Sequence, residues 1–262
     1  MLNSRRSFLK NLGGITGAAL VASSVFDPRL VKQVEAAAAK IAHLPPAEVA
    51  SDEDFWFQVQ QAFSTTRGII NLNNGGVSPQ PKIVQSALVR YNEFSNEAPA
   101  HTMWSILGPR RETIRTQLAE LAGCSPEEIA IVRNTTEALE TIIFGLDMNR
   151  GDEILTTNQD YPSMMRAWHQ REKREGIVVK TVSIPTPPEN VSQITKALEK
   201  GITKKTRVIM VSHIIFLTGQ ITPVKKICDM AHDRGIEVII DAAHSFAHLD
   251  LDHCKTSKAI DN

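Results

Sequence analysis

The sequence predicts an α/β fold with a doubly wound, mainly parallel sheet for the central and C-terminal part of the chain. From about residue 129 onward, short apolar runs alternate with longer stretches of helical periodicity. The apolar runs are rich in Val and Ile, as is typical of strands that are buried on both faces. Gly151, Gly176 and Gly235 stand where a helix has to end before the next strand begins.

Three helices are expected before this alternation starts. Residues 55–63 have aromatic and apolar side chains at helical spacing. Ser78 as N-cap and Pro79 in the first turn predict a helix over about 80–95. A further helix is expected over 109–122, with its apolar side chains on one face.

The alternating part contains five expected strands and four expected helices. The strands are placed at 129–133, 153–157, 177–183, 207–212 and 236–240. The helices are placed at 135–146, 162–175, 191–200 and 223–234. This order is typical of parallel strands that are joined by crossover helices.

The composition is that of an ordinary globular protein. Of the 262 residues, 42% are hydrophobic and 22% are charged. Lys plus Arg and Asp plus Glu number 29 each, so the charge gives no argument for nucleic acid as a partner. The three cysteines, Cys124, Cys228 and Cys254, form no Cys-x-x-Cys pair, and we expect neither a metal site nor a disulfide framework.

The N-terminus has the pattern of an export signal. Residues 4–10, Ser-Arg-Arg-Ser-Phe-Leu-Lys, resemble the twin-arginine consensus, and residues 11–26 form a mildly apolar region. This region is shorter than the roughly 20 apolar residues of a membrane span, so no stable membrane anchor is expected. We interpret residues 1–39 as a signal peptide that is cut near Ala36–Ala39. The twin-arginine translocation machinery would then export the folded protein, for instance to the periplasm.

The rest of the chain divides into three expected parts. Residues 40–80 are an entry segment, 81–250 form the α/β domain, and 251–262 are a tail of atypical sequence.

Four loops that follow strands carry the unusual polar residues, and each has two interpretations. Asn134–Ala138 opens a helix and is either an anion site or an N-cap with a capping box closed by Glu137. Tyr161 could stack on a planar ligand, or it is a semi-buried residue before a helix that begins with Pro162.

The other two loops contain histidines. His213 ends an apolar strand, which is unusual for a group that needs a polar partner, but it could be a satisfied core histidine. Asp241 could hold a protonated aromatic nitrogen, with His244 nearby, or both could be helix caps.

The order and spacing of these pieces resemble one family. They are Asn-Thr-Thr-Glu-Ala at 134–138, Tyr-Pro at 161–162, Ser-His…Thr-Gly-Gln at 212–220 and Asp-Ala-Ala-His at 241–244. Together they resemble the class V aminotransferases, which are pyridoxal 5'-phosphate (PLP) enzymes of fold type I. The similarity extends over about residues 55–250, is greatest to the isopenicillin N epimerase-like branch, and includes kynureninase around Asp-x-Ala-His.

The resemblance implies a role for each site residue. Thr135 and Thr136 would bind the phosphate of PLP, Tyr161 would stack on its ring, Asp241 would pair with its pyridinium nitrogen, and His213 and His244 would be further cofactor-binding residues. Asn74 would lie near the substrate, a small amino acid. Members of this fold type are usually homodimers with active sites at the interface.

Two departures from the family pattern stand out. Ile215 and Phe216 take the place of a small polar residue that follows the His in many relatives. The Schiff-base lysine of the family lies beyond a further strand, and neither Lys255 nor Lys258 is expected to replace it. The last strands and the small C-terminal domain of the family are likewise not expected here.

These observations lead to three hypotheses for the function. The first is the N-terminal part of a PLP-dependent enzyme acting on amino acids, an aminotransferase or an isopenicillin N epimerase-like protein, inactive as given. The second is a non-catalytic truncated domain of the same fold, a pseudoenzyme or a fragment of a gene. A third, an unrelated α/β ligand-binding domain, requires the order of the motifs to be coincidence.

Overall fold

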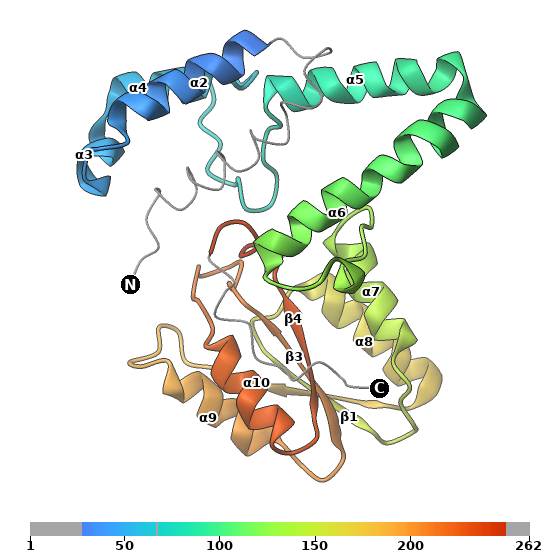
Figure 1. Cartoon of the computed structure of the whole chain (residues 1–262). Helices are drawn as coiled ribbons and strands as arrows, with labels where there is room; N and C mark the ends of the chain where they lie inside the picture. The colour runs from blue at the N-terminus through green and yellow to red at the C-terminus, as the bar shows by residue number, and fades with distance from the viewer. Residues whose placement is uncertain (1–27, 67, 250–262) are drawn as a thin grey trace. The chain divides into compact units, whose positions relative to one another are not determined.

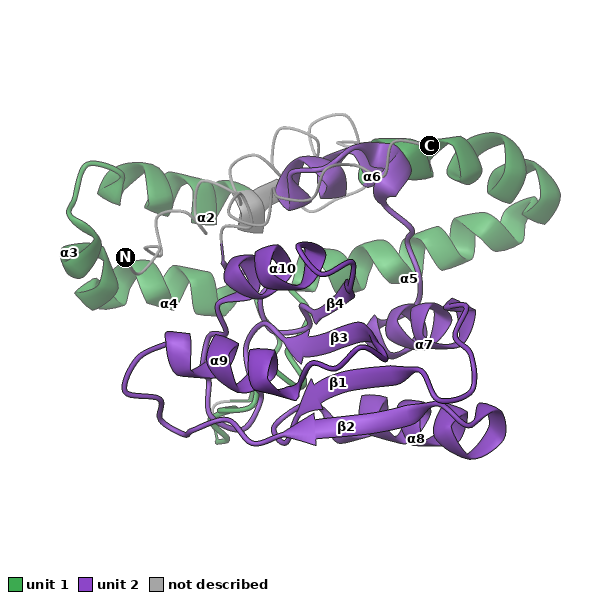
Figure 2. Ribbon diagram, turned by 90° about the horizontal axis from the view of Figure 1, so that it is seen from below, with its two compact units in different colours: residues 1–114 green, residues 115–262 purple. Residues whose placement is uncertain are grey.

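The structure, a computed structural model, describes residues 28–66 and 68–249. The chain falls into two compact units that divide between Ile114 and Arg115 (Figure 2). The described part of the first unit is helical, and the second unit contains a sheet with helices packed on it. The twin-arginine motif and the C-terminal tail lie outside the described residues.

The first unit begins with three helices that share a small core. Its elements are α2 (Pro28–Ile41), α3 (Pro46–Ser51), α4 (Glu53–Gln61), α5 (Lys82–Glu97), the π-helical segment η2 (His101–Leu107) and the part of α6 (Gly108–Ala122) up to Ile114 (Figure 1). Phe55 of α4 is buried with Ile41 and Val49, and Trp56 Nε1 donates to the Val49 carbonyl at 3.0 Å. The helix expected over 55–63 is therefore confirmed. None of the described helices is long and apolar enough to cross a membrane.

The two long helices agree with the prediction, but the start of the first one does not. The expected N-cap at Ser78 is wrong, because Pro81 occupies the N-cap position of α5. Pro81 has extended backbone angles, and its carbonyl accepts the first helical hydrogen bonds, from Val84 and Gln85. Pro79 lies before the helix and not in its first turn.

The second unit contains the predicted parallel sheet. Its elements are η3 (Pro126–Glu128), α7 (Thr135–Gly145), β1 (Glu153–Thr157), α8 (Pro162–Glu175), β2 (Val178–Val182), α9 (Ser192–Gly201), β3 (Thr206–Ser212), α10 (Val224–His232) and β4 (Glu237–Asp241). The strands pair in the order β2-β1-β3-β4, and every pair is parallel. Four of the five predicted strands are thus confirmed to within one or two residues.

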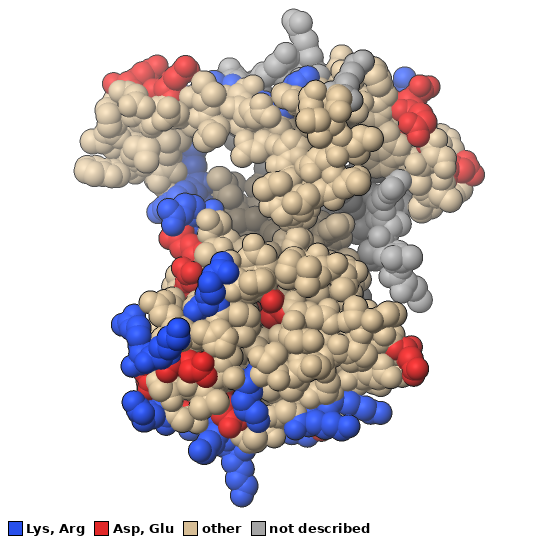
Figure 3. All heavy atoms as spheres, turned by 180° about the vertical axis from the view of Figure 1, so that it is seen from behind, with Lys and Arg blue, Asp and Glu red and all other residues tan. Residues whose placement is uncertain are grey.

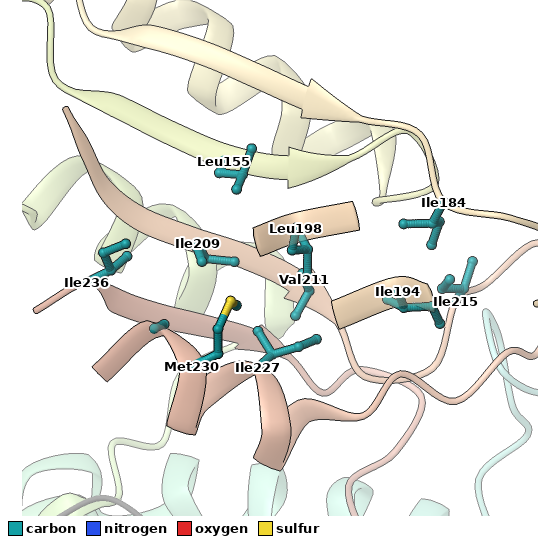
Figure 4. Packing of buried hydrophobic residues seen from close by; sticks show 11 residues of the cluster. Leu155, Ile184, Ile194, Leu198, Ile209, Val211, Ile215, Ile227, Met230 and Ile236 are labelled. Atoms are coloured by element: carbon teal, nitrogen blue, oxygen red, sulfur yellow. The ribbon is translucent and has the colours of Figure 1, made fainter. Parts of the chain in front are cut away.

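Both faces of the central strands are buried, because successive side chains of a strand point to opposite faces. Leu155, Ile209 and Val211 pack with residues of α9 and α10 in one hydrophobic cluster (Figure 4). Val208 and Met210, on the opposite face of β3, pack with residues of α7 and α8 in a second cluster. Helices on both faces make the sheet doubly wound, as the Val- and Ile-rich strands predict.

The strand predicted over 129–133 is wrong. These residues pair with no strand in the part of the chain that the structure describes. Ile131 is 51% exposed and Val132 is 41% exposed. Their β-branched side chains favour an extended backbone, but a strand also needs a neighbour to satisfy its N–H and C=O groups.

One glycine is required by close packing. A Cβ atom on Gly201, the last residue of α9, would lie 2.7 Å from Val182 Cγ1 and 2.9 Å from Leu155 Cδ1. The absence of a side chain therefore lets the end of α9 contact β1 and β2 directly.

Charges of both signs intermix on the face shown in Figure 3. In the second unit, Arg234 contacts Glu199 at 2.6 Å, and Arg207 contacts Asp152 at 3.4 Å. Each pair is at least partly exposed and contributes little to stability, about 0–1 kcal/mol.

A packing mutation in β3, one of the two central strands, should lower the stability of the second unit. We expect Ile209→Ala to lower the free energy of unfolding by about 2–4 kcal/mol, because the fully buried side chain leaves a cavity between β3 and the α9–α10 layer. Ile131→Ala, the same change at a half-exposed position, should cost less than about 1 kcal/mol. Urea denaturation followed by circular dichroism measures both values. Equal losses would contradict the assigned core.

Candidate functional site

The carboxyl ends of the parallel strands meet at one edge of the sheet and form the candidate site. After β1 the chain crosses to β2 on one side, and after β3 it crosses to β4 on the other. The order therefore reverses between β1 and β3, which is the switch point where ligands bind in open α/β sheets. The loops that leave this edge carry Tyr161, His213, Asp241 and His244, so the structure brings these four predicted residues to the same edge.

A buried carboxylate, that of Asp160, links the carboxyl ends of β1 and β3 by hydrogen bonds. Its Oδ2 accepts hydrogen bonds from Thr156 Oγ1 at 2.7 Å and from the Thr157 N–H and hydroxyl at 2.8 and 2.7 Å. Its Oδ1 accepts from the Ser212 N–H at 2.7 Å and the Ser212 hydroxyl at 3.0 Å. With five donors around it, this carboxylate has little capacity left for a ligand.

Asp241 is equally buried but much less engaged. Its side chain is 7% exposed, and its Oδ1 accepts from the Ala243 N–H at 3.0 Å. Within the described residues, this is the one hydrogen bond that the carboxylate accepts. Burial raises the pKa of Asp241, and the nearby charge of Asp160 raises it further, while Ala243 and His244 oppose the shift. Because it accepts one hydrogen bond within the described residues, the Asp241 carboxylate has capacity left to accept from a cationic N–H group, whose charge would oppose the raised pKa.

His213 lies next to Asp241 across the β3–β4 ladder. Its N–H donates to the Asp241 carbonyl at 2.9 Å, and its carbonyl accepts from the Thr222 N–H at 2.9 Å. The side chain is buried, and burial lowers its pKa, so the ring is neutral at neutral pH. Ring atom Nδ1 is buried without a hydrogen-bond partner among residues 28–66 and 68–249. The interpretation of His213 as a satisfied core histidine is therefore wrong, since buried polar atoms normally have a partner.

Tyr161 lies between β1 and α8 and contacts an aromatic residue of the loop after β3. Its ring meets Phe216 edge to face, with the centroids 5.2 Å apart and the planes at 86°. Tyr161 is 42% exposed. Because Ile215 is buried in the core cluster, the loop that carries Phe216 is anchored at the sheet edge. The partial exposure of Tyr161 is compatible with stacking on a planar ring.

The N-terminus of α7 lies at the same end of the sheet as the carboxyl ends of the strands. Helices α7 and α8 pack side by side, and near their C-terminal ends Arg171 donates to the Ile143 carbonyl. The two helices therefore start on the same side, and α8 starts directly after the loop at the end of β1.

The first turn of α7 has the expected N-cap but not the expected capping box. Asn134 is the N-cap and accepts from the Glu137 N–H at 2.9 Å. Glu137 reaches the Arg133 N–H at 2.9 Å instead of the Asn134 N–H that a capping box requires. The backbone N–H groups of Thr135 and Thr136 donate to no other group in the described chain. They are available to an anion, which the helix dipole also favours.

Sequence reasoning missed Asp160 and Ser212 as site residues. The signal for Asp160 was present, since it is an acid just after a buried strand, as Asp241 is. Asn74 belongs to the first unit, where its side chain stabilises a turn with Asn71, and its role near the substrate stays a prediction. No three His, Cys, Asp or Glu side chains of the described chain come together as a metal site.

The raised pKa of Asp241 predicts an effect on stability. Because the pKa is higher in the folded than in the unfolded chain, the folded state loses stability as the pH rises through the interval between the two values. Asp241→Asn removes this loss, and we expect it to raise the free energy of unfolding by about 1 kcal/mol at neutral pH. The gain should shrink as the pH falls towards the ordinary Asp value of about 3.9. Urea titrations of both proteins across this range test it, and a destabilised variant would contradict it.

Comparison with known proteins places this geometry in a family. Residues 70–258 match the model of the family "Aminotransferase class-V". Isopenicillin N epimerase of Streptomyces clavuligerus is 31% identical over 187 residues, which are 70% of this chain and 46% of the relative. A probable cysteine desulfurase of Synechocystis sp. is 30% identical over 191 residues, 70% of this chain and 45% of the relative. The chain thus spans about half the length of the curated relatives it matches.

Solved structures agree on the fold. Cysteine desulfurase from Thermococcus onnurineus NA1 superimposes with a TM-score of 0.63 at 24% identity, over 74% of this chain and 49% of that chain. A mutant of C-DES with glycine covalently linked to its PLP cofactor superimposes with a TM-score of 0.59 at 24% identity, over 69% of this chain and 48% of that chain. The resemblance seen in the motifs is confirmed: the chain belongs to the class V aminotransferase family.

Proposed function

We propose that this chain forms the cofactor-binding part of a PLP-dependent enzyme that acts on an amino acid, and that it binds PLP at the carboxyl edge of β1, β3 and β4. The observation that carries the proposal is Asp241. It is a buried carboxylate at the carboxyl end of β4 in a class V aminotransferase sheet, and within the described residues it has acceptor capacity left.

The residues at this edge fit the polar groups of PLP. A protonated pyridine nitrogen would give Asp241 the cationic donor that its carboxylate can accept, and would favour its ionised form despite burial. The first turn of α7 would bind the phosphate through the free N–H groups of Thr135 and Thr136. Tyr161 would stack on the ring. Nδ1 of His213, which has no partner within the described residues, and the half-buried His244 would supply further polar contacts.

The chain's own residues would orient and charge the cofactor. When bound, PLP withdraws electrons from a bond at Cα of the substrate. Asp241 would keep the ring nitrogen protonated, which is the condition for that withdrawal. Tyr161 would fix the plane of the ring, and the α7 terminus would fix its phosphate end. Transamination and epimerisation are the proposed reactions for the whole enzyme.

Binding of PLP to the purified chain tests the proposal directly. We expect saturable quenching of tryptophan fluorescence by PLP, and at least about tenfold weaker binding for Asp241→Asn, since a neutral amide cannot pair with the pyridinium. Asp229→Asn, the same change on the exposed face of α10, should bind like the parent. The same variant of Asp241 should thus be more stable and bind less well. Equal affinity of all three proteins would overturn the assignment of Asp241.

The mode of attachment separates the two hypotheses about catalysis. Lys255 and Lys258 lie outside the described residues, and the expectation that neither is the Schiff-base lysine stays a prediction. The PLP-loaded chain is reduced with borohydride, and its peptides are analysed by mass spectrometry. We expect no single lysine to carry the PLP label in proportion to bound PLP. A single lysine labelled in proportion to bound PLP would contradict this and favour a catalytic chain. PLP binding without labelling favours the non-catalytic domain.

We also propose that the family's homodimer is the assembly of the intact enzyme. Helix α5 supports it, because none of its residues is buried and Val84, Leu88 and Val89 are exposed. Exposed apolar side chains on one helix are compatible with a protein interface. Light scattering coupled to size-exclusion chromatography measures the mass in solution.

Export by the twin-arginine machinery is the proposed route out of the cytoplasm. The support is the Ser-Arg-Arg-Ser-Phe-Leu-Lys motif at residues 4–10. A fusion of residues 1–39 to a folded fluorescent reporter should reach the periplasm, and the Arg5→Lys/Arg6→Lys double variant should leave it in the cytoplasm. Export of both fusions, or of neither, would contradict the assignment. The two fusions differ at these two residues alone and keep the same charge, so their comparison isolates the guanidinium groups of the motif.

A further inference from the structure

The side-chain carboxylate of Asp160 joins the carboxyl ends of two strands, β1 and β3. It is 6% exposed, and its oxygens face in two directions. Oδ2 accepts from the end of β1, at Thr156 and Thr157. Oδ1 accepts from Ser212, the last residue of β3. Beyond the last β1–β3 ladder pair, Leu155 and Ile209, this carboxylate continues the connection between the two strands.

The connection continues from Ser212 to Asp241. Ser212 is the ladder partner of Asp241, and the next residue, His213, donates its N–H to the Asp241 carbonyl at 2.9 Å. Asp160, Ser212, His213 and Asp241 are therefore connected in series, by hydrogen bonds from Ser212 to Asp160 and from His213 to Asp241 and by the peptide bond between Ser212 and His213. A displacement of Ser212 would move both Asp241 and His213.

The charge of Asp160 acts on the same carboxylate. It is a like charge near Asp241 and raises the pKa of that group, in the same direction as burial, whereas His244 lowers it. Since all five donors around Asp160 are already used, Asp160 does not compete with Asp241 for a cationic ligand. The two acids thus have different roles: Asp160 links the strand ends, and Asp241 would bind the ligand.

We propose that Asp160 is a positioning residue that ties the end of β1 to the end of β3 and so holds Asp241 and His213 in place for the cofactor. The proposal rests on the proposed function, in which Asp241 receives the ring nitrogen of PLP. Asp160 acts through Ser212 and the ladder and does not contact the cofactor itself.

The isosteric variant Asp160→Asn tests it in the full 262-residue chain. An amide cannot accept from donors on both sides, so Ser212 or Thr157 loses its partner. We expect faster hydrogen exchange at the His213 amide, a lower pKa of Asp241 in a 13Cγ NMR titration, and about tenfold weaker binding of PLP, the effect expected when a supporting group of a binding residue is removed.

A matched control is available at the opposite edge of the sheet. Asp152→Asn makes the same chemical change just before β1, where Asp152 accepts from the Asn149 N–H and pairs with Arg207. It should leave the Asp241 titration, the His213 exchange rate and the PLP affinity unchanged. A folded Asp160→Asn variant that matches Asp152→Asn in all three measurements would overturn the proposal.

A milder variant keeps the test decisive if Asp160→Asn does not fold. Thr157→Val removes one donor to Asp160 and keeps the charge and the backbone. It should speed exchange at the His213 amide and weaken PLP binding about threefold. Parent-like values of both would overturn the proposal. If the parent chain binds no PLP, the proposed function fails, while the exchange rate and the Asp241 titration in the PLP-free chain still decide the role of Asp160.

Discussion

The common direction of the four strands is the constraint on which the rest of the second unit depends. Parallel neighbours cannot be joined by tight turns, so each strand has to be followed by a helix that returns to the opposite edge. Those helices bury both faces of the sheet and leave all the carboxyl ends together. The loops that carry Asp160, His213 and Asp241 therefore meet because of the topology, although up to 81 residues separate Asp160 from Asp241.

The two buried acids at this edge show how similar side chains acquire different roles. Asp160 has donors on every side and joins two strands. Asp241 has a raised pKa and, in the part of the chain that the structure describes, one donor, so it has acceptor capacity for another partner. Burying a carboxylate with so few hydrogen bonds is costly, and such cost is usually found where a protein binds something. The structure therefore distinguishes an acid whose acceptor sites are filled from an acid that has acceptor capacity left within the described residues.

The region that matches the family model includes the candidate site. The matched region, 70–258, contains the strands and the loops of the candidate site, and the superimposed structures share this sheet. Since the chain spans about half of each relative, activity and substrate belong to the proposals, whereas the fold and the family are established.

The sequence by itself determined the family, four strands, their parallel direction and the residues that follow them. Those features depend on local periodicity and on short motifs, both of which involve residues close together in the sequence. The error at 129–133 has the opposite cause, because β-branched residues favour an extended backbone but cannot supply a pairing partner. Among the described residues, tertiary structure alone decided that Asp160 is saturated while Asp241 is not, and that Nδ1 of His213 has no partner. The number of donors around a buried group depends on which strands lie side by side, and no single segment contains that information.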